Sequence, residues 1–240
     1  MEHFQSQFRT LSLKKVEKMN LSDAYNALLT KVNVPFGQYM TAEQLSNIEH
    51  ANNKGIVGQI IEDVLGLPHT STLLDFDDGE LKTNKCNHVS PVETIAVTQI
   101  STGIDDLLDN VPFEDSRVFN KIRNMLLVPM DKASNDVRQW KILACFVVSY
   151  DNPSYQPLFE QIRMDYISIC NEVRQRLMPP SNGMLHTESG MYLQIRTKDS
   201  KPYTPIHSTI LDRDVSNKQY AFYFRKTLMK ELLQGLQGGL

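Results

Sequence analysis

Several features that would assign this chain to a common protein class are missing from its sequence. Its three cysteines, Cys86, Cys145 and Cys170, do not have the paired spacing of a zinc site, and an odd number suits a reducing compartment. No apolar run approaches the length that crosses a bilayer, and the first residues, MEHFQSQFRTLSLKK, lack the apolar core of a signal peptide. An intracellular, cytoplasmic location without membrane contact is therefore expected.

Two common catalytic signatures are also missing. The sequence has no glycine-rich loop of the kind that cradles phosphates, which argues against a nucleotide-processing enzyme. Its six histidines are scattered, and none forms an evident serine–histidine arrangement. We therefore expect no covalent intermediate.

The charge of the chain is unevenly distributed, although its net value is only −3. Residues 61–120 contain twelve acidic and three basic side chains, whereas residues 192–230 contain eight basic and three acidic ones. Such an asymmetry is expected where one region gathers metal-binding carboxylates and another gathers partners for phosphates. A solvated surface with chance asymmetry explains the charge pattern equally well. At 240 residues, the chain is long enough to bury a substantial core.

The most informative segment is residues 54–83, which reads KGIVGQIIEDVLGL, then the acidic bend LLDFDDG, then ELKT. It predicts a helix carrying Glu62, a bend carrying Asp75, and a strand carrying Glu80 and Lys82. Side chains two apart in a strand point to the same face, so Glu80 and Lys82 should project together while Leu81 faces a core. Carboxylates beside a lysine suit a Mg²⁺ site that activates water against a phosphodiester. A lone Glu-x-Lys pair is more often an ordinary solvated pair.

The remaining pattern predicts a mixed α/β fold with helices before and after a central sheet. Helices are expected from Asn20-Leu21-Ser22-Asp23 and from Thr41, whose neighbour Gln44 completes a capping box. Segment 117–127 reads as a helix or helix end that leads into LLVPM. The other expected elements are strands at 80–83, 94–100, 141–150 and 192–197, a helix at 159–177, and a strand running into a helix at 219–233.

These segments, in this order, resemble the MutH-like endonucleases, a family of the MutH mismatch-repair enzyme and GATC-cutting type II restriction endonucleases. The resemblance rests on KGIVGQIIEDVLG, DFDDGELKT, PVETIAV, SRVFNKIRNMLLVPM, FEQIRMDYISI, GMYLQIRTK and AFYFRKTLMKELL, and it covers residues 54–233. It implies a restriction-endonuclease-like PD-(D/E)xK fold, with a central mixed sheet and two lobes that form a DNA cleft. The implied single domain spans residues 1–240, with a catalytic lobe at about 1–115 and a DNA-reading lobe with the C-terminal helix at about 116–240.

The resemblance also implies a role for each matching residue. Glu62 corresponds to the helix glutamate that assists the metal site, Asp75 and Glu80 to metal ligands, and Lys82 to the lysine that orients water. With the backbone carbonyl of Leu81, Asp75 and Glu80 would hold one or two Mg²⁺ ions. Residues implied to contact DNA are Lys54, Lys121, Arg196, Lys198, Tyr223, Arg225 and Lys226.

The bend departs from the family pattern. Asp75 precedes Glu80 by five residues, whereas the family usually has seven, so Asp77 or Asp78 could be the ligand instead. Asn84-Lys85 also stands where the family usually has a proline. We prefer Asp75, because its Asp-Phe pair matches.

Three functions are consistent with these features. The leading one is a Mg²⁺-dependent type II restriction endonuclease that cleaves double-stranded DNA at GATC-like sites, most simply as a homodimer on the palindrome. The second is a mismatch-repair nickase that cuts the unmethylated strand at GATC. The third is a DNA-binding relative without catalytic activity.

Overall fold

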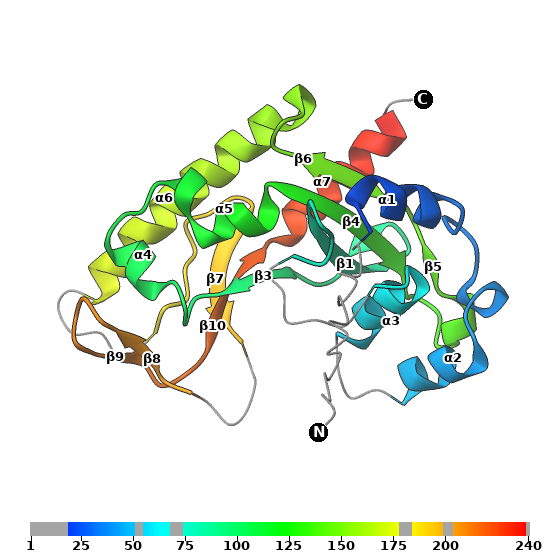
Figure 1. Ribbon diagram of the computed structural model, residues 1–240, viewed down its shortest axis with the longest axis horizontal. Helices are drawn as coiled ribbons and strands as arrows, with labels where there is room; N and C mark the ends of the chain where they lie inside the picture. The colour runs from blue at the N-terminus through cyan, green and yellow to red at the C-terminus, as the bar shows by residue number, and fades with distance from the viewer. Residues whose placement is uncertain (1–18, 51–54, 68–73, 178–183, 199–203, 239–240) are drawn as a thin grey trace, which may run out of the picture.

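A mixed β-sheet built around two parallel strands forms the centre of the molecule (Figure 1). The structure is a computed structural model, and it describes residues 19–50, 55–67, 74–177, 184–198 and 204–238. Strands β1 (Glu80–Asn87) and β4 (Asn124–Asp131) run parallel, in register from Glu80 opposite Met125 to Cys86 opposite Asp131. The shorter strands of this five-stranded sheet pair antiparallel with them, and they are β2 (Ser90–Pro91), β5 (Lys141–Ile142) and β6 (Phe146–Ser149).

Strand β4 is buried on both faces and divides the apolar interior into two cores. Leu126, Val128 and Met130 face the first core, whereas Met125 and Leu127 face the second, and all five side chains are fully buried. An uninterrupted apolar run is typical of a parallel strand that is covered on both sides. The alternation therefore assigns each side chain of the neighbouring β1 to one core or the other.

Three helices from the N-terminal part cover the first core. They are α1 (Leu21–Leu29), α2 (Ala42–Glu49) and α3 (Ile56–Val64). The Asn20 side chain accepts a hydrogen bond from the Asp23 amide at 2.8 Å, and Thr41 and Gln44 form a reciprocal capping box. Both predicted helix starts are confirmed.

A three-stranded antiparallel sheet forms one wall of the second core. Its order is β3 (Ile95–Gln99), β10 (Tyr220–Phe224) and β7 (Leu193–Thr197). Helices α4 (Ile104–Leu108), α5 (Arg117–Ile122), α6 (Gln156–Leu177) and α7 (Lys226–Gly238) lie beside it, and β8 (Ile206–Ser208) and β9 (Arg213–Ser216) form a separate hairpin. Short 3₁₀ turns occur at Phe36–Gln38, Phe113–Asp115, Val137–Gln139 and Pro153–Tyr155.

One buried carboxylate holds the chain where it enters β7. Asp165 of α6 accepts hydrogen bonds from the backbone amides of Met191, Tyr192 and Leu193 at 2.9, 2.6 and 2.8 Å. Gly190 precedes this anchor, and a Cβ there would lie only 1.9 Å from the Leu193 carbonyl oxygen. The anchor fixes where β7 begins and therefore where its later residues project.

The mixed α/β class is confirmed, and further sheets accompany the central mixed one. The described residues form three sheets, and both larger sheets combine strands from before and after residue 115. The division into two lobes expected near residue 115 stays a prediction. Among the helices in the described ranges, none is long and apolar enough to cross a membrane.

The single strand expected at residues 141–150 is wrong, because the chain forms β5 and β6 with a break between them. Ile142 pairs with Met130, and Phe146 pairs with Leu127. The chain therefore advances four residues between β5 and β6 while β4 advances only three. Pro129 lies at this point of β4 and has no amide to donate, so an extra residue is accommodated as in a bulge.

The bend before β1 allows no side chain at its last residue. The Phe76 amide donates to the Gly79 carbonyl at 2.9 Å, and Asp78 accepts a hydrogen bond from the Leu21 amide at the start of α1. A Cβ on Gly79 would lie 2.6 Å from Leu21 Cδ1 and 2.8 Å from the Asn124 carbonyl oxygen. The glycine thus lets the bend, α1 and β4 meet.

We expect Gly79→Ala to lower the free energy of unfolding by about 1–3 kcal/mol, because the added methyl group forces the backbone of β4 or the bend to move. Gly235→Ala is the matched control. Gly235 lies inside α7 with nothing within 4 Å of an added Cβ, so alanine should stabilise the protein by up to about 1 kcal/mol. Urea unfolding of both variants checks this, and equal effects of the two changes would contradict the steric argument.

Candidate functional site

A buried carboxylate held by two lysines lies at the start of β1. Glu80 is 3% exposed, and its Oε1 accepts a hydrogen bond from Lys82 Nζ at 2.5 Å. Lys121 Nζ donates to both Glu80 oxygens, at 2.9 Å each. We call these three residues the Glu80 cluster.

The register of β1 produces this cluster. Glu80 and Lys82 lie opposite Met125 and Leu127 and so face the second core, from which α5 contributes Lys121. Leu81 faces the first core and is 5% exposed. The predictions that Glu80 and Lys82 project together and that Leu81 enters a core are both confirmed.

The bend places Asp75 against the same segment of backbone. Asp75 Oδ2 accepts a hydrogen bond from the Leu81 amide at 2.9 Å, next to Glu80. Asp77 is exposed, and Asp78 uses its carboxylate to cap α1. Of the three candidate aspartates, Asp75 is therefore the one whose carboxylate hydrogen-bonds to β1.

Glu62 lies on the helix that covers the other face of β1. A Cβ on Gly58, one turn earlier in α3, would lie 3.6 Å from Thr83 Oγ1, and Thr83 lies two residues after Leu81 on β1. The Glu62 carbonyl accepts a hydrogen bond from the Leu67 amide, and its side chain is half-buried. Because α3 and Lys121 lie on opposite sides of β1, a catalytic role for Glu62 stays a prediction.

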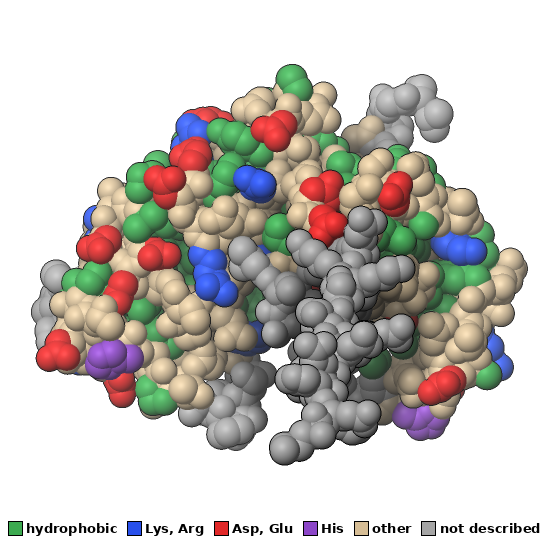
Figure 2. All heavy atoms as spheres, in the orientation of Figure 1, with side chains coloured by type: hydrophobic (Ala, Val, Ile, Leu, Met, Phe, Trp, Pro, Cys, Tyr) green, Lys and Arg blue, Asp and Glu red, His purple; other side chains and the backbone are tan. Residues whose placement is uncertain are grey.

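A basic hollow of about 390 Å³ opens beside the cluster. Three cationic side chains line it, Arg117, Lys121 and Lys198, and none of its described lining residues is acidic. The small residues Ala96 and Ala221 leave space in its wall. In Figure 2, Lys and Arg side chains lie near the middle of the view, beside the grey atoms, and acidic side chains lie above them and toward the left-hand end. The charge of the hollow suits an anion.

The pKa of Lys198 links the hollow to the Glu80 cluster. Burial lowers the pKa of the Lys198 ammonium, and the positive charge of Lys82 lowers it further. The two ammonium groups therefore repel each other. Lys82 and Lys121 thus contact the Glu80 carboxylate, while Lys198 and Arg117 line the adjoining hollow together with Lys121.

One face of the three-stranded sheet carries the predicted DNA-reading residues. Phe222 and Phe224 are buried in the second core, whereas Tyr223 is half-buried on the opposite face, as expected from the pattern. Arg196 pairs with Ala221 in the register of β7 and β10 and is exposed, and Lys198 follows two residues later. Arg196, Lys198 and Tyr223 are therefore brought to one surface.

The other predicted DNA contacts lie elsewhere. Arg225 donates from Nη2 to the Glu188 carbonyl oxygen at 2.8 Å, an internal contact that holds the loop before β7. Lys226 is exposed at the start of α7. Lys54 lies outside the described residues. Phosphate contacts by these residues stay predictions.

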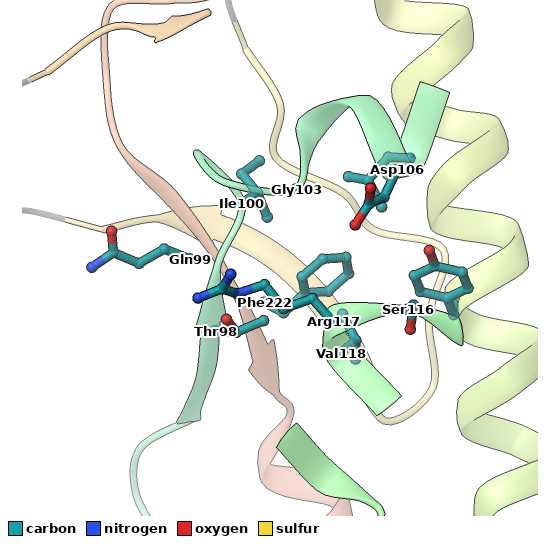
Figure 3. A pocket seen from close by; sticks show the side chains of 11 residues that line it. Thr98, Gln99, Ile100, Gly103, Asp106, Ser116, Arg117, Val118 and Phe222 are labelled. Atoms are coloured by element: carbon teal, nitrogen blue, oxygen red, sulfur yellow. The ribbon is translucent and has the colours of Figure 1, made fainter. Parts of the chain in front are cut away.

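Arg117 is a candidate that the sequence reasoning missed. It is exposed at the first position of α5, after the capping residue Ser116, and stands four residues before Lys121. Residues four apart share a helix face, so this spacing could have indicated a pair of cations. Figure 3 shows Arg117 extending from α5 toward Thr98 and Gln99 of β3, which line the hollow with it. The pocket drawn there has a volume of only about 10 Å³, close to the lower limit for one water.

The donor atoms around Leu81 fit magnesium. The described part of the chain contains no group of three or more His, Cys, Asp or Glu side chains that could hold a metal. Magnesium, however, is commonly held by one or two carboxylates together with waters and substrate phosphates. Asp75 and Glu80 supply two carboxylates, and the Leu81 carbonyl lies on the same strand edge as its amide, which faces Asp75. These are hard oxygen donors of the required kind.

Comparisons with known proteins do not assign the chain to a family. No family model matches it, and no curated protein sequence matches it.

We expect Lys82→Met to raise the pKa of Lys198, because the substitution removes the neighbouring positive charge, while burial still holds this pKa below its usual value. The pH dependence of Lys198 acylation, followed by mass spectrometry, measures the change. Lys85→Met removes an exposed lysine from the same strand and serves as the control. An equal rise in both variants would show that Lys82 does not act on Lys198 directly.

Proposed function

We propose that this chain is a magnesium-dependent endonuclease that hydrolyses phosphodiester bonds of double-stranded DNA as a type II restriction enzyme. The observation that carries the proposal is the Glu80 cluster beside the basic hollow. A carboxylate pair at a strand end and a lysine two residues later adjoin a surface charged to receive phosphate. The expected preference for GATC-like sites follows from the resemblance of residues 54–233 to MutH-like endonucleases.

The cluster has the groups that phosphodiester hydrolysis requires. A magnesium ion held by Asp75, Glu80 and the Leu81 carbonyl would neutralise charge on the phosphate and lower the pKa of a water bound to it. Lys82 holds its ammonium 2.5 Å from Glu80 Oε1, where it adds positive charge beside the reacting phosphate and orients the attacking water. Glu80 keeps that ammonium in place, because the carboxylate and the lysine lie on the same strand face.

The basic hollow holds the DNA backbone in this proposal. Arg117, Lys121 and Lys198 neutralise phosphates, which positions a duplex without selecting its sequence. Sequence reading is assigned to the adjacent sheet face with Arg196, Lys198 and Tyr223. An arginine or a lysine there can donate hydrogen bonds to guanine O6 and N7 in the major groove.

If each chain has one active site, the number of DNA strands cut indicates whether the protein acts as a homodimer. A palindromic site presents the same bond on both strands, so a homodimer would cut both with one site from each protomer. Linear plasmid would support the restriction enzyme, and nicked circles would support a mismatch-repair nickase. Binding without cleavage would support a DNA-binding relative that lacks activity.

We expect the wild-type protein with Mg²⁺ to cleave an unmethylated plasmid containing GATC, and Lys82→Ala to be slower by about 100-fold or more, because a charge at the transition state is lost. Glu80→Gln and Asp75→Asn should also lose cleavage, because each removes a carboxylate. Gel analysis with end mapping measures activity, cut site and strand number. A parallel digest of adenine-methylated plasmid measures methyl sensitivity.

Lys85→Ala is the matched control for Lys82→Ala, because Lys85 is an exposed lysine of the same strand. It should cleave like the wild type. Equal cleavage by Lys82→Ala and the wild type would remove Lys82 from the mechanism. No cleavage by the wild type on any plasmid would overturn the endonuclease proposal.

Duplex binding without Mg²⁺ should depend on salt through the residues of the hollow. Arg117→Ala should lower the slope of log affinity against log salt by about one, because one phosphate contact is lost. Fluorescence anisotropy at several salt concentrations measures the slope. Arg138→Ala is the control, because Arg138 is exposed and pairs with Asp136 at 2.9 Å. The same slope for Arg117→Ala and the wild type would contradict a role for the hollow in binding DNA.

A further inference from the structure

Lys121 belongs to two sites at once. Its ammonium donates to both oxygens of Glu80 at 2.9 Å, and its side chain also lines the basic hollow. Symmetric contact with both oxygens of a carboxylate is a position that a metal cation can also occupy. The same lysine can therefore serve as a counter-ion of Glu80 or as a partner for an anion in the hollow.

The charges around Glu80 make these two roles exclusive. Lys82 already neutralises this buried carboxylate, and Lys121 adds a second positive charge. A divalent cation placed against Glu80 would be repelled by both ammonium groups in a region from which water is largely excluded. A phosphate in the hollow has the opposite effect, because its negative charge attracts Lys121 away from the carboxylate.

The positions of the two lysines indicate which one moves. Lys82 belongs to the same strand as Glu80 and contacts only its Oε1 atom. It can therefore stay beside the carboxylate when a cation binds at the other oxygen. Lys121 comes from the last turn of α5 and is among the described residues that line the basic hollow, whereas Lys82 is not. The two side chains are almost equally exposed, at 16% for Lys82 and 15% for Lys121, so their difference lies in the hollow that Lys121 lines.

We propose that Lys121 occupies the cation position on Glu80 until a phosphodiester enters the basic hollow, and that its transfer to the phosphate opens Glu80 to a divalent cation. This inference rests on the proposed function and deepens it, because it makes metal binding dependent on DNA. Lys121 is then a positioning residue that prevents the metal site from filling before substrate is present. Linkage requires the converse as well, so a bound divalent cation strengthens duplex binding by the same factor.

The test measures metal affinity rather than cleavage. Ca²⁺, another cation that prefers oxygen ligands, is titrated calorimetrically into the full-length protein with and without a saturating short duplex that lacks GATC. Heats from titration into duplex alone are subtracted. The proteins are the wild type, Lys121→Gln, Lys121→Arg and Lys85→Gln. The glutamine can still donate one hydrogen bond to Glu80 but carries no charge.

The wild type should bind Ca²⁺ about tenfold or more tightly when duplex is present, within the usual range of coupling between sites. Lys121→Gln should bind Ca²⁺ without duplex clearly more tightly than the wild type does, and duplex should add less. Lys121→Arg restores the charge and should restore the low affinity of the free protein. Lys85→Gln should behave as the wild type.

Two results would overturn the inference. One is a Ca²⁺ affinity of the wild type that duplex leaves unchanged, a measurement that needs no folded variant. The other is a folded Lys121→Gln protein, shown by its thermal unfolding, with the metal affinity and coupling of the wild type. In both cases cleavage by the wild type with Mg²⁺ would leave the proposed function intact. A wild type that neither binds duplex nor cleaves it would refute the proposed function, and this inference with it.

Discussion

The buried carboxylate of Glu80 is the constraint on which the arrangement of the site depends. A glutamate that is 3% exposed must be paired, because burying an unpaired charge is very costly. Its two partners come from β1 and α5, and Lys121 lies 41 residues after Glu80 in the sequence, so satisfying one carboxylate joins the central sheet to the helix that borders the hollow. Apolar residues in place of a buried charge cluster are often neutral or stabilising, so stability alone does not account for the Glu80 cluster.

Much of the local structure could be predicted from the sequence, because it depends on neighbouring residues. The cap of α1, the capping box of α2, and the projection of Glu80 and Lys82 on one side of β1 with Leu81 on the other all follow from short-range geometry. The outward position of Tyr223 between two buried phenylalanines follows from strand alternation in the same way. Each of these features needs only a few consecutive residues to be recognised.

The features that were not predicted depend on contacts between distant segments. The break between β5 and β6 reflects Pro129 on the opposite strand, which no pattern within residues 141–150 records. The basic hollow is formed by β3, α5, β10 and the end of β7, so its shape emerges only when the sheet is assembled. Arg117 was missed for this reason, although its spacing from Lys121 was visible.

The three hydrogen bonds that Asp165 accepts from backbone amides also fix the register of β7 against β10. A strand that slips by one residue along its neighbour turns every side chain to the opposite face. Slippage of β7 along β10 would direct Arg196 and Lys198 into the interior and would break all three hydrogen bonds to Asp165 at the same time. A single carboxylate on α6 thus protects the alignment of a surface to which it does not itself belong.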